Sequence, residues 1–332
     1  MIVDFQHHYT PKKMVEAKGG GSGIGTFFKD GRPGHTYHPL LYDLDSHIVM
    51  MDKAGIDISV LTCGEGYDSD LETCQGINQE MKQVVDAYGG RFMCLGSAPA
   101  TGGPEAMKEV ARCADEYGFP GIAIVSELQG LALDDAAFDP FWAECQRRGL
   151  YVFVHPINHA ITWERMDTDD LHRCVGREFS LIVACIKLIC SGVLDRYPDL
   201  MVQFGHLAGG VGWYVGRFRS YLEDKEFWGT ADHPIHGRKP EHDFMHYIEN
   251  RLMFDTGGWS GPIDTARYAV QWIERGLMDI PAERMVFATD YPQAVRTDQE
   301  IVDYVAGVKA LGADGAKILS TQNAARLIPG LV

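Results

Sequence analysis

The sequence predicts an α/β protein, a single (β/α)8 barrel of the TIM type that spans residues 1–332. Eight short segments rich in apolar and β-branched residues recur along the chain, and stretches with helical apolar spacing separate them. No run of linker-like composition divides the 332 residues, so one large barrel explains the pattern better than two doubly wound domains. Such a barrel would carry inserted loops at the C-terminal face of its strands.

The eight predicted strands are short apolar segments that end near a glycine, a proline or a polar turn. The first lies in residues 1–11, an apolar stretch that turns polar just before a proline. The other seven are expected at 58–62, 91–96, 121–125, 151–156, 201–206, 252–256 and 285–290.

Helices and loops are expected between these strands. Apolar residues recur there with helical spacing, and several stretches end at a glycine, which suits a helix C-terminus. The glycine-rich stretch after the first strand lacks the Lys-Ser/Thr of a phosphate-binding loop, so residues 19–41 are predicted to form a lid or flexible insertion. Residues 157–170 and 225–245 are further loops expected beside the site. The predicted helices are 42–54, 78–88, 104–117, 138–148, 177–190 and 264–276.

The composition argues against several classes of function. A formal net charge of −16 disfavours binding to nucleic acid or to an anionic membrane, although one pocket can still be locally positive for a small anion. The eight cysteines form no C-x-x-C pair, which predicts reduced core thiols in a cytoplasmic protein. The sequence has no leader-like segment and no long uncharged apolar run, so neither a signal peptide nor a membrane span is expected.

Residues of the metal-ligand type stand at the ends of four predicted strands. His8 ends the first strand, His155 the fifth, His206 the sixth and Asp290 the eighth. Catalytic groups of such barrels gather at the C-terminal ends of the strands, so these side chains are expected to converge. Imidazoles with a carboxylate suit Zn²⁺ or another first-row dication. One buried histidine more often bonds to a carbonyl group, but recurrence at four strand ends favours a metal site.

The first and fourth strands refine this prediction. Strand alternation puts Asp4, Gln6 and His8 on one face, where a metal ion would satisfy polar groups whose burial is otherwise costly. Residues 124–126, at the end of the fourth strand, include no Lys or Glu that could bridge a second ion. The site is therefore predicted to hold a single metal ion.

Four residues are candidates for binding a small carboxylated substrate. Arg217, on a short predicted helix, could hold a carboxylate through two parallel hydrogen bonds, and a surface ion pair is the equal alternative. Gln6 shares a strand face with His8. Trp259 and Tyr291 follow the seventh and eighth strands.

Several motifs resemble the amidohydrolase 2 branch of the amidohydrolase superfamily. That branch contains aminocarboxymuconate-semialdehyde, γ-resorcylate and carboxyvanillate decarboxylases, together with oxalomesaconate hydratase. The resemblance runs from the first strand to residues 323–327, and it implies the barrel fold for nearly the whole chain. The motifs are Asp4-x-Gln6-x-His8-x-x-Pro11, Val154-His155-Pro156, the block 191–198 leading to Gly205-His206, and Ala288-Thr289-Asp290-Tyr291-Pro292.

The resemblance also implies roles for individual residues. His8, His155 and Asp290 match the ligands of one divalent metal ion, expected to be Zn²⁺ with Mn²⁺ as the alternative. His206 matches the catalytic histidine that orients or deprotonates a metal-bound water. Arg217 matches an arginine that reaches the substrate carboxylate of a neighbouring subunit, which implies a homodimer or a higher homo-oligomer. Gln6 departs from the family, which has His or Glu there, and a carboxamide oxygen is a weaker ligand than either.

These implications predict a metal-dependent carbon–carbon lyase. We expect a non-oxidative decarboxylase of a carboxylated aromatic or of its ring-cleavage product, with His206, Asp290 and Arg217 as catalytic residues. The alternative is a metal-dependent hydrolase or hydratase that acts on an ester, a lactone or an alkene, and release of CO2 separates the two. A metal-poor binding protein is the non-enzymatic alternative, which the metal content would reveal.

Overall fold

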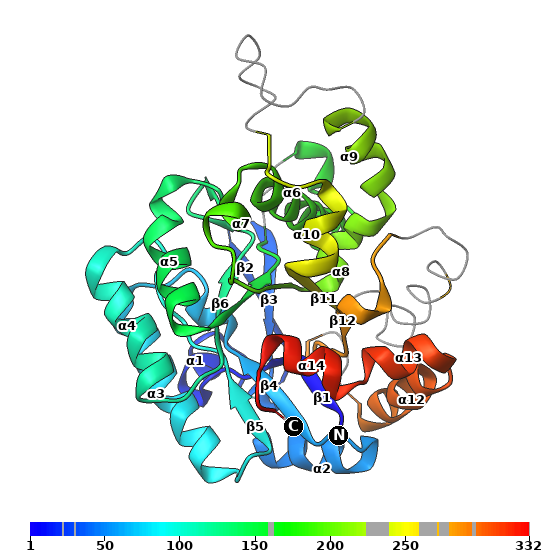
Figure 1. Cartoon of the computed structure of the whole chain (residues 1–332). Helices are drawn as coiled ribbons and strands as arrows, with labels where there is room; N and C mark the ends of the chain where they lie inside the picture. Colours follow the sequence, from blue (N-terminus) through cyan, green and yellow to red (C-terminus); the bar gives the residue numbers. More distant parts are fainter. Residues whose placement is uncertain are drawn as a thin grey trace.

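Parallel strands alternate with helices along the chain, as the α/β prediction requires. The computed structural model describes residues 1–21, 23–29, 31–158, 163–223, 239–258, 271, 279–293 and 297–331. The strands lie towards the centre of the molecule and the helices lie outside them (Figure 1). The predicted helix 264–276 falls almost entirely outside the described residues.

Two parallel sheets contain the predicted strands. One has the order β1–β4–β5, and the other has the order β12–β11–β10–β9–β6. Each of these strands lies within one of the segments predicted from the sequence. Their bounds are Val3–His8 (β1), Ile58–Thr62 (β4), Phe92–Cys94 (β5), Gly121–Val125 (β6), Tyr151–His155 (β9), Val202–Phe204 (β10), Leu252–Asp255 (β11) and Met285–Val286 (β12).

Main-chain hydrogen bonds cross both gaps between the two sheets. At one seam the Phe5 N–H donates to the Phe287 carbonyl oxygen at 2.9 Å, so the first strand lies beside the segment that follows β12. At the other seam the Gly96 N–H donates to the Gly121 carbonyl and the Ala123 N–H donates to the Gly96 carbonyl, both at 2.9 Å. The ends of the first and last strands are therefore neighbours in space.

The helices pack against one another around the strands. Helix α2 packs against α12, and α4 packs against both α3 and α5. Local sequence fixes their ends: Asp70 caps α3 by accepting the Thr73 N–H at 2.8 Å, and Gly149 ends α5 with a φ of 66°. The helices are Lys12–Ala17 (α1), Leu44–Ala54 (α2), Leu71–Ala87 (α3), Gly103–Asp115 (α4), Asp139–Arg148 (α5), Arg177–Cys190 (α6), Val193–Arg196 (α7), His206–Gly210 (α8), Val215–Leu222 (α9), Phe244–Asn250 (α10), Asp298–Lys309 (α12), Gly312–Ile318 (α13) and Thr321–Leu327 (α14).

The apolar core fills the space between strands and helices. Phe5, Phe153 and Phe204 reach it from strands, Trp142 from α5 and Tyr304 from α12, and all five are fully buried. The eight cysteines are free thiols, and six of them are buried, but Cys174 is exposed and Cys190 is half-buried, so the predicted core location is wrong for these two. None of the described helices is long and apolar enough to cross a lipid bilayer.

The described part of residues 19–41, which were predicted to form a lid or flexible insertion, has regular secondary structure. It contains an antiparallel hairpin formed by β2 (Gly25–Lys29) and β3 (Arg32–Tyr37). Tyr37 and Leu41 pack against Val15, and the three residues form a small buried cluster separate from the main core. This cluster holds the hairpin against α1, so its order depends on contacts that a polar composition does not reveal.

A register irregularity in β1 changes the predicted face of Asp4. The pairing of β1 with β4 shifts between Asp4 and His7, so the simple alternation that placed Asp4 beside Gln6 does not hold. Instead, Asp4 Oδ2 lies 2.9 Å from His7 Nδ1 and accepts the Thr289 hydroxyl at 2.6 Å. Asp4 Oδ1 accepts the Thr289 N–H at 2.9 Å. Asp4 therefore fastens β1 to the segment that leads into Asp290.

Replacing Asp4 with Ala should lower the free energy of unfolding by about 3–5 kcal/mol, because a buried hydrogen-bonded carboxylate is lost while its partners stay buried. Chemical denaturation followed by circular dichroism measures this change. The matched variant Asp4→Asn keeps an acceptor oxygen and should lose less. An Asp4→Ala protein as stable as the wild type would show that Asp4 does not fasten the two segments.

Candidate active site

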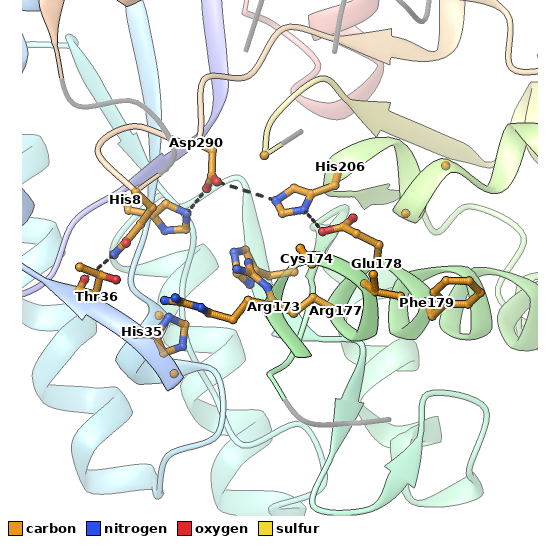
Figure 2. A pocket seen from close by; sticks show the side chains of 18 of the residues that line it. His8, His35, Thr36, Arg173, Cys174, Arg177, Glu178, Phe179, His206 and Asp290 are labelled. Carbon is orange, nitrogen blue, oxygen red and sulfur yellow. Dashed lines mark hydrogen bonds and ion pairs between the residues drawn. The ribbon is translucent and has the colours of Figure 1, made fainter. Parts of the chain in front are cut away.

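The ends of four strands open into one cavity of about 1010 Å³. His8 from β1, His155 from β9, His206 after β10 and Asp290 after β12 all line this cavity. All four are at most 5% exposed. In Figure 2, dashed lines join His8, Asp290, His206 and Glu178 into one chain of contacts. The fold thus brings together the four residues that were predicted to lie at the ends of separate strands.

Three of these residues form a compact set of metal donors. The ligand atoms of His8, His155 and Asp290 lie within 4.8 Å of one another. His8 Nε2 is 2.7 Å from Asp290 Oδ1. His155 Nδ1 is 2.8 Å from the Pro156 carbonyl oxygen, so Nδ1 carries the proton and Nε2 keeps its lone pair. Two imidazoles and a carboxylate in this arrangement fit a first-row divalent cation and leave positions for further ligands.

The surroundings favour the protonation states that a metal site needs. Burial lowers the pKa of His155 well below its usual range, and the neighbouring His8 adds to the effect. Burial alone would raise the pKa of Asp290, but the contact with His8 and the charges of His206 and Arg177 lower it overall. A neutral imidazole and an ionised carboxylate are the forms that bind metal ions.

His206 is held on both sides of its ring. Nδ1 lies 2.9 Å from Glu178 Oε1, while Nε2 lies 3.2 Å from Gln6 Nε2 and 3.9 Å from Asp290 Oδ2. Burial alone would lower the pKa of His206, but the carboxylates of Glu178 and Asp290 together raise it. A buried histidine with a raised pKa beside a cavity is suited to proton transfer.

The backbone that carries His206 adopts an unusual conformation. Residues 206–208 have φ values between 51° and 53°, and Asp290 has a φ of 56°, all in the left-handed region that side chains disfavour. The buried Asp255 accepts the His206 N–H at 3.0 Å, and the Gln203 amide holds its other oxygen at 2.8 Å. Burial raises the pKa of Asp255 to about 6. These hydrogen bonds hold the turn and thereby fix the position of the His206 ring.

The side-chain amide of Gln6 points its nitrogen, and not its oxygen, towards the possible metal ligands described above. Its Nε2 donates to Asp290 Oδ1 at 2.8 Å and lies beside His206. The opposite amide orientation would set the oxygen against the Asp290 carboxylate, which is repulsive. Gln6 Oε1 is buried and has no hydrogen-bond partner in the described part of the chain. It lies close to Gly257, where a residue with a side chain would place its Cβ only 2.8 Å from this oxygen. In this geometry Gln6 is a hydrogen-bond donor that helps to orient Asp290.

The other predicted substrate contacts lie away from the described lining of the cavity. Tyr291 is 1% exposed and packs behind the site against His7 and His47, with ring centroids 5.2 and 5.0 Å away. The cis peptide bond before Pro292 follows it directly. Arg217 is exposed on α9, where its guanidinium lies 5.0 Å from the Tyr221 ring centroid. Trp259 falls outside the described residues.

Sequence reasoning missed the wall that α6 contributes. Arg173, in the turn before α6, and Arg177 and Glu178, at its start, all line the cavity. The available signal was an adjacent pair of charges at the beginning of an otherwise apolar predicted helix. Such a pair is costly to bury unless it has partners or a ligand, so it could have been selected as a site candidate.

Comparison with known proteins supplies a family. The model of the family described as amidohydrolase matches residues 3–329. The chain belongs to the amidohydrolase family. The matched range includes all of the strands of the two parallel sheets and all of the possible metal ligands of this amidohydrolase.

Relatives of this amidohydrolase include decarboxylases. It is 30% identical over 210 residues to 2-amino-3-carboxymuconate-6-semialdehyde decarboxylase of Dictyostelium discoideum, a match that spans 60% of this chain and 57% of that protein. It is 23% identical over 307 residues to gamma-resorcylate decarboxylase of Rhizobium sp. strain MTP-10005, a match that covers 87% and 88% of the two chains.

A solved structure shares the fold. The 5-carboxyvanillate decarboxylase of Novosphingobium aromaticivorans, in complex with manganese and 4-hydroxy-3-methoxy-5-nitrobenzoic acid, superposes with a TM-score of 0.79. The two chains are 18% identical, and the superposition covers 98% of this chain and 95% of the other.

Replacing Glu178 with Gln should lower the pKa of His206 in the metal-free protein, because the Glu178 carboxylate is the strongest influence that raises it. His206 would then lose its proton at a lower pH than in the wild type. Titration of the histidine ring signals by NMR measures the shift. Glu65→Gln is the matched control, since Glu65 lines the same cavity but contacts Tyr37 instead. An unchanged titration of His206 in Glu178→Gln would contradict the assignment.

Proposed function

We propose that this amidohydrolase is a metal-dependent lyase, a non-oxidative decarboxylase of a carboxylated aromatic or of its ring-cleavage product. The observation that carries the proposal is the buried set of possible metal ligands His8, His155 and Asp290, with His206 beside it in one cavity. The decarboxylases among its relatives support the reaction type.

The proposal includes the architecture around the site. We infer that the two sheets form one closed (β/α)8 barrel and that residues 1–332 are a single domain. The hydrogen bonds across both seams support this inference, since each gap between the sheets is bridged. The cavity then opens at the C-terminal ends of the strands, where barrels of this kind carry their active sites.

One divalent ion would be held by His8, His155 and Asp290. When bound, it would act as a Lewis acid that withdraws electron density from the substrate and lowers the energy of the charge developing on it. The sequence favours Zn²⁺ with Mn²⁺ as the alternative, and the structurally similar 5-carboxyvanillate decarboxylase contains manganese.

Residues of the chain would supply the proton that the substrate carbon takes up. Decarboxylation breaks a carbon–carbon bond, releases CO2 and leaves an electron pair on the substrate carbon, which must then take up a proton. His206 would deliver this proton from its cavity side, while Glu178 holds the opposite nitrogen and keeps the ring in position. Gln6 would hold Asp290 through its amide N–H.

Carbon dioxide release from metal-loaded protein tests the function. Hydroxylated aromatic acids and carboxylated ring-cleavage products should lose one CO2 for each substrate consumed, and removal of the metal by a chelator should abolish the reaction because the developing charge is no longer stabilised. Substrate consumption and CO2 are measured together. Consumption of water without CO2 would instead support a hydrolase or hydratase.

His206→Ala is the control for this experiment. It should keep its metal, measured by elemental analysis, but lose about 10²-fold or more in turnover, the usual contribution of a general acid–base group. Loss of the metal in this variant would make His206 a ligand, and normal turnover would remove it from the mechanism.

Arg217 is proposed to serve the site of a neighbouring subunit in a cytoplasmic homodimer or higher homo-oligomer. Its exposure, away from the described lining of its own cavity, is compatible with this role. Mixing inactive Arg217→Ala chains with inactive His206→Ala chains should restore part of the activity, because a mixed dimer contains one site with both groups intact. Activity is measured after demonstrated subunit exchange, and no recovery would contradict the shared site.

A further inference from the structure

Arg177 lines the cavity, and its guanidinium has no hydrogen-bond or ion-pair partner among the described residues. Its Nε is buried and lacks a hydrogen-bond partner, and no carboxylate among the described residues forms an ion pair with it. Arg173, one turn earlier on the same wall, is different because Asp170 accepts hydrogen bonds from its Nε at 2.8 and 2.9 Å. Asp170 therefore pairs with the charge of Arg173, whereas no carboxylate in the described part of the chain pairs with that of Arg177.

The nearest carboxylate in sequence does not neutralise Arg177. Glu178 turns its Oε1 to His206 Nδ1 at 2.9 Å. Arg177 nevertheless faces the reacting centre, because it lines the same cavity as His8, His206 and Asp290. In Figure 2, Arg177 and Asp290 lie on opposite sides of the cavity.

Arg177 is half-buried, and an unpaired cation that is partly removed from water is stabilised when an anion joins it. Arginine is suited to this task because its planar guanidinium can bind both oxygens of one carboxylate. The chain as a whole has a net charge of −16, so a positive group in the cavity favours the binding of an acidic substrate there. These facts indicate that a carboxylate of the substrate completes the pairing.

The chemistry of decarboxylation identifies which carboxylate this is. The departing group loses its charge as the carbon–carbon bond breaks, because CO2 is neutral. A guanidinium bound to that group would stabilise the substrate more than the transition state and would raise the barrier. A second carboxylate keeps its charge throughout the reaction, so Arg177 can hold it without slowing the chemical step.

We propose that Arg177 is a substrate-binding residue that selects dicarboxylic substrates, in which one carboxylate leaves and Arg177 holds the other. The choice between the two carboxylates rests on the proposed decarboxylase function, whereas anion binding by Arg177 does not. A cavity of about 1010 Å³ has room for an aromatic ring or its open-chain product between the metal donors and α6.

Binding measurements test the proposal without relying on turnover. The probes are benzoate and the three benzenedicarboxylate isomers, titrated calorimetrically into metal-loaded protein. Wild type should bind at least one dicarboxylate about tenfold or more tightly than benzoate, the scale of a charge-assisted hydrogen-bonded pair. In Arg177→Gln this preference should vanish while the benzoate affinity stays the same, and Arg177→Lys should retain part of the preference.

Arg173→Gln is the matched control, because Arg173 lies on the same wall but is already paired with Asp170. It should keep the preference for the dicarboxylate, and thermal unfolding confirms that all variants are folded. The proposal is overturned if wild type shows no preference, if Arg177→Gln keeps it, or if Arg173→Gln loses it equally. Failure of the decarboxylase function would appear separately, as absence of CO2 from a dicarboxylate that still binds through Arg177.

Discussion

The contact between His8 and Asp290 is the interaction on which the rest of the structure depends. These residues are 282 positions apart in the chain, and their side chains meet at 2.7 Å in a buried environment. A carboxylate is stable there only with partners on several sides, which His8 and Gln6 supply directly. The contact also requires the first and last strands to be neighbours, and the hydrogen bond from the His8 N–H to the Tyr291 carbonyl at 2.7 Å fixes their register. The same contacts thus place the first strand beside the segment after the last strand and bring two of the metal-donor residues together.

The strands and the donor residues could be predicted because both leave a local signal. Each strand is a short apolar segment, and His8, His155 and Asp290 stand where such segments end. The face of Asp4 could not be predicted, because the irregularity in β1 exists only in its pairing with β4. The hairpin of residues 25–37 was missed for a similar reason, since its order depends on the small buried cluster around Val15.

The missed parts of the site depend on helix orientation, which the sequence does not contain. Glu178 and His206 are 28 residues apart, and their contact follows from how α6 packs beside the turn after β10. The same packing decides that Arg177 lines the cavity while Arg217 is exposed on α9. A family motif selects an arginine by its neighbours in sequence, but only the packed helices decide which guanidinium faces the metal donors.

The left-handed backbone at His206 and Asp290 has a consequence for how this site can evolve. Among residues with side chains, His, Asn and Asp tolerate positive φ best, whereas β-branched residues tolerate it poorly. At both positions the chemistry and the backbone therefore favour the same small set of amino acids. Substitution of His206 or Asp290 by Val, Ile or Thr would both remove the functional group and strain the backbone. New activities on this scaffold are more accessible through the cavity wall of α6, where the helical backbone accepts any of the ordinary side chains.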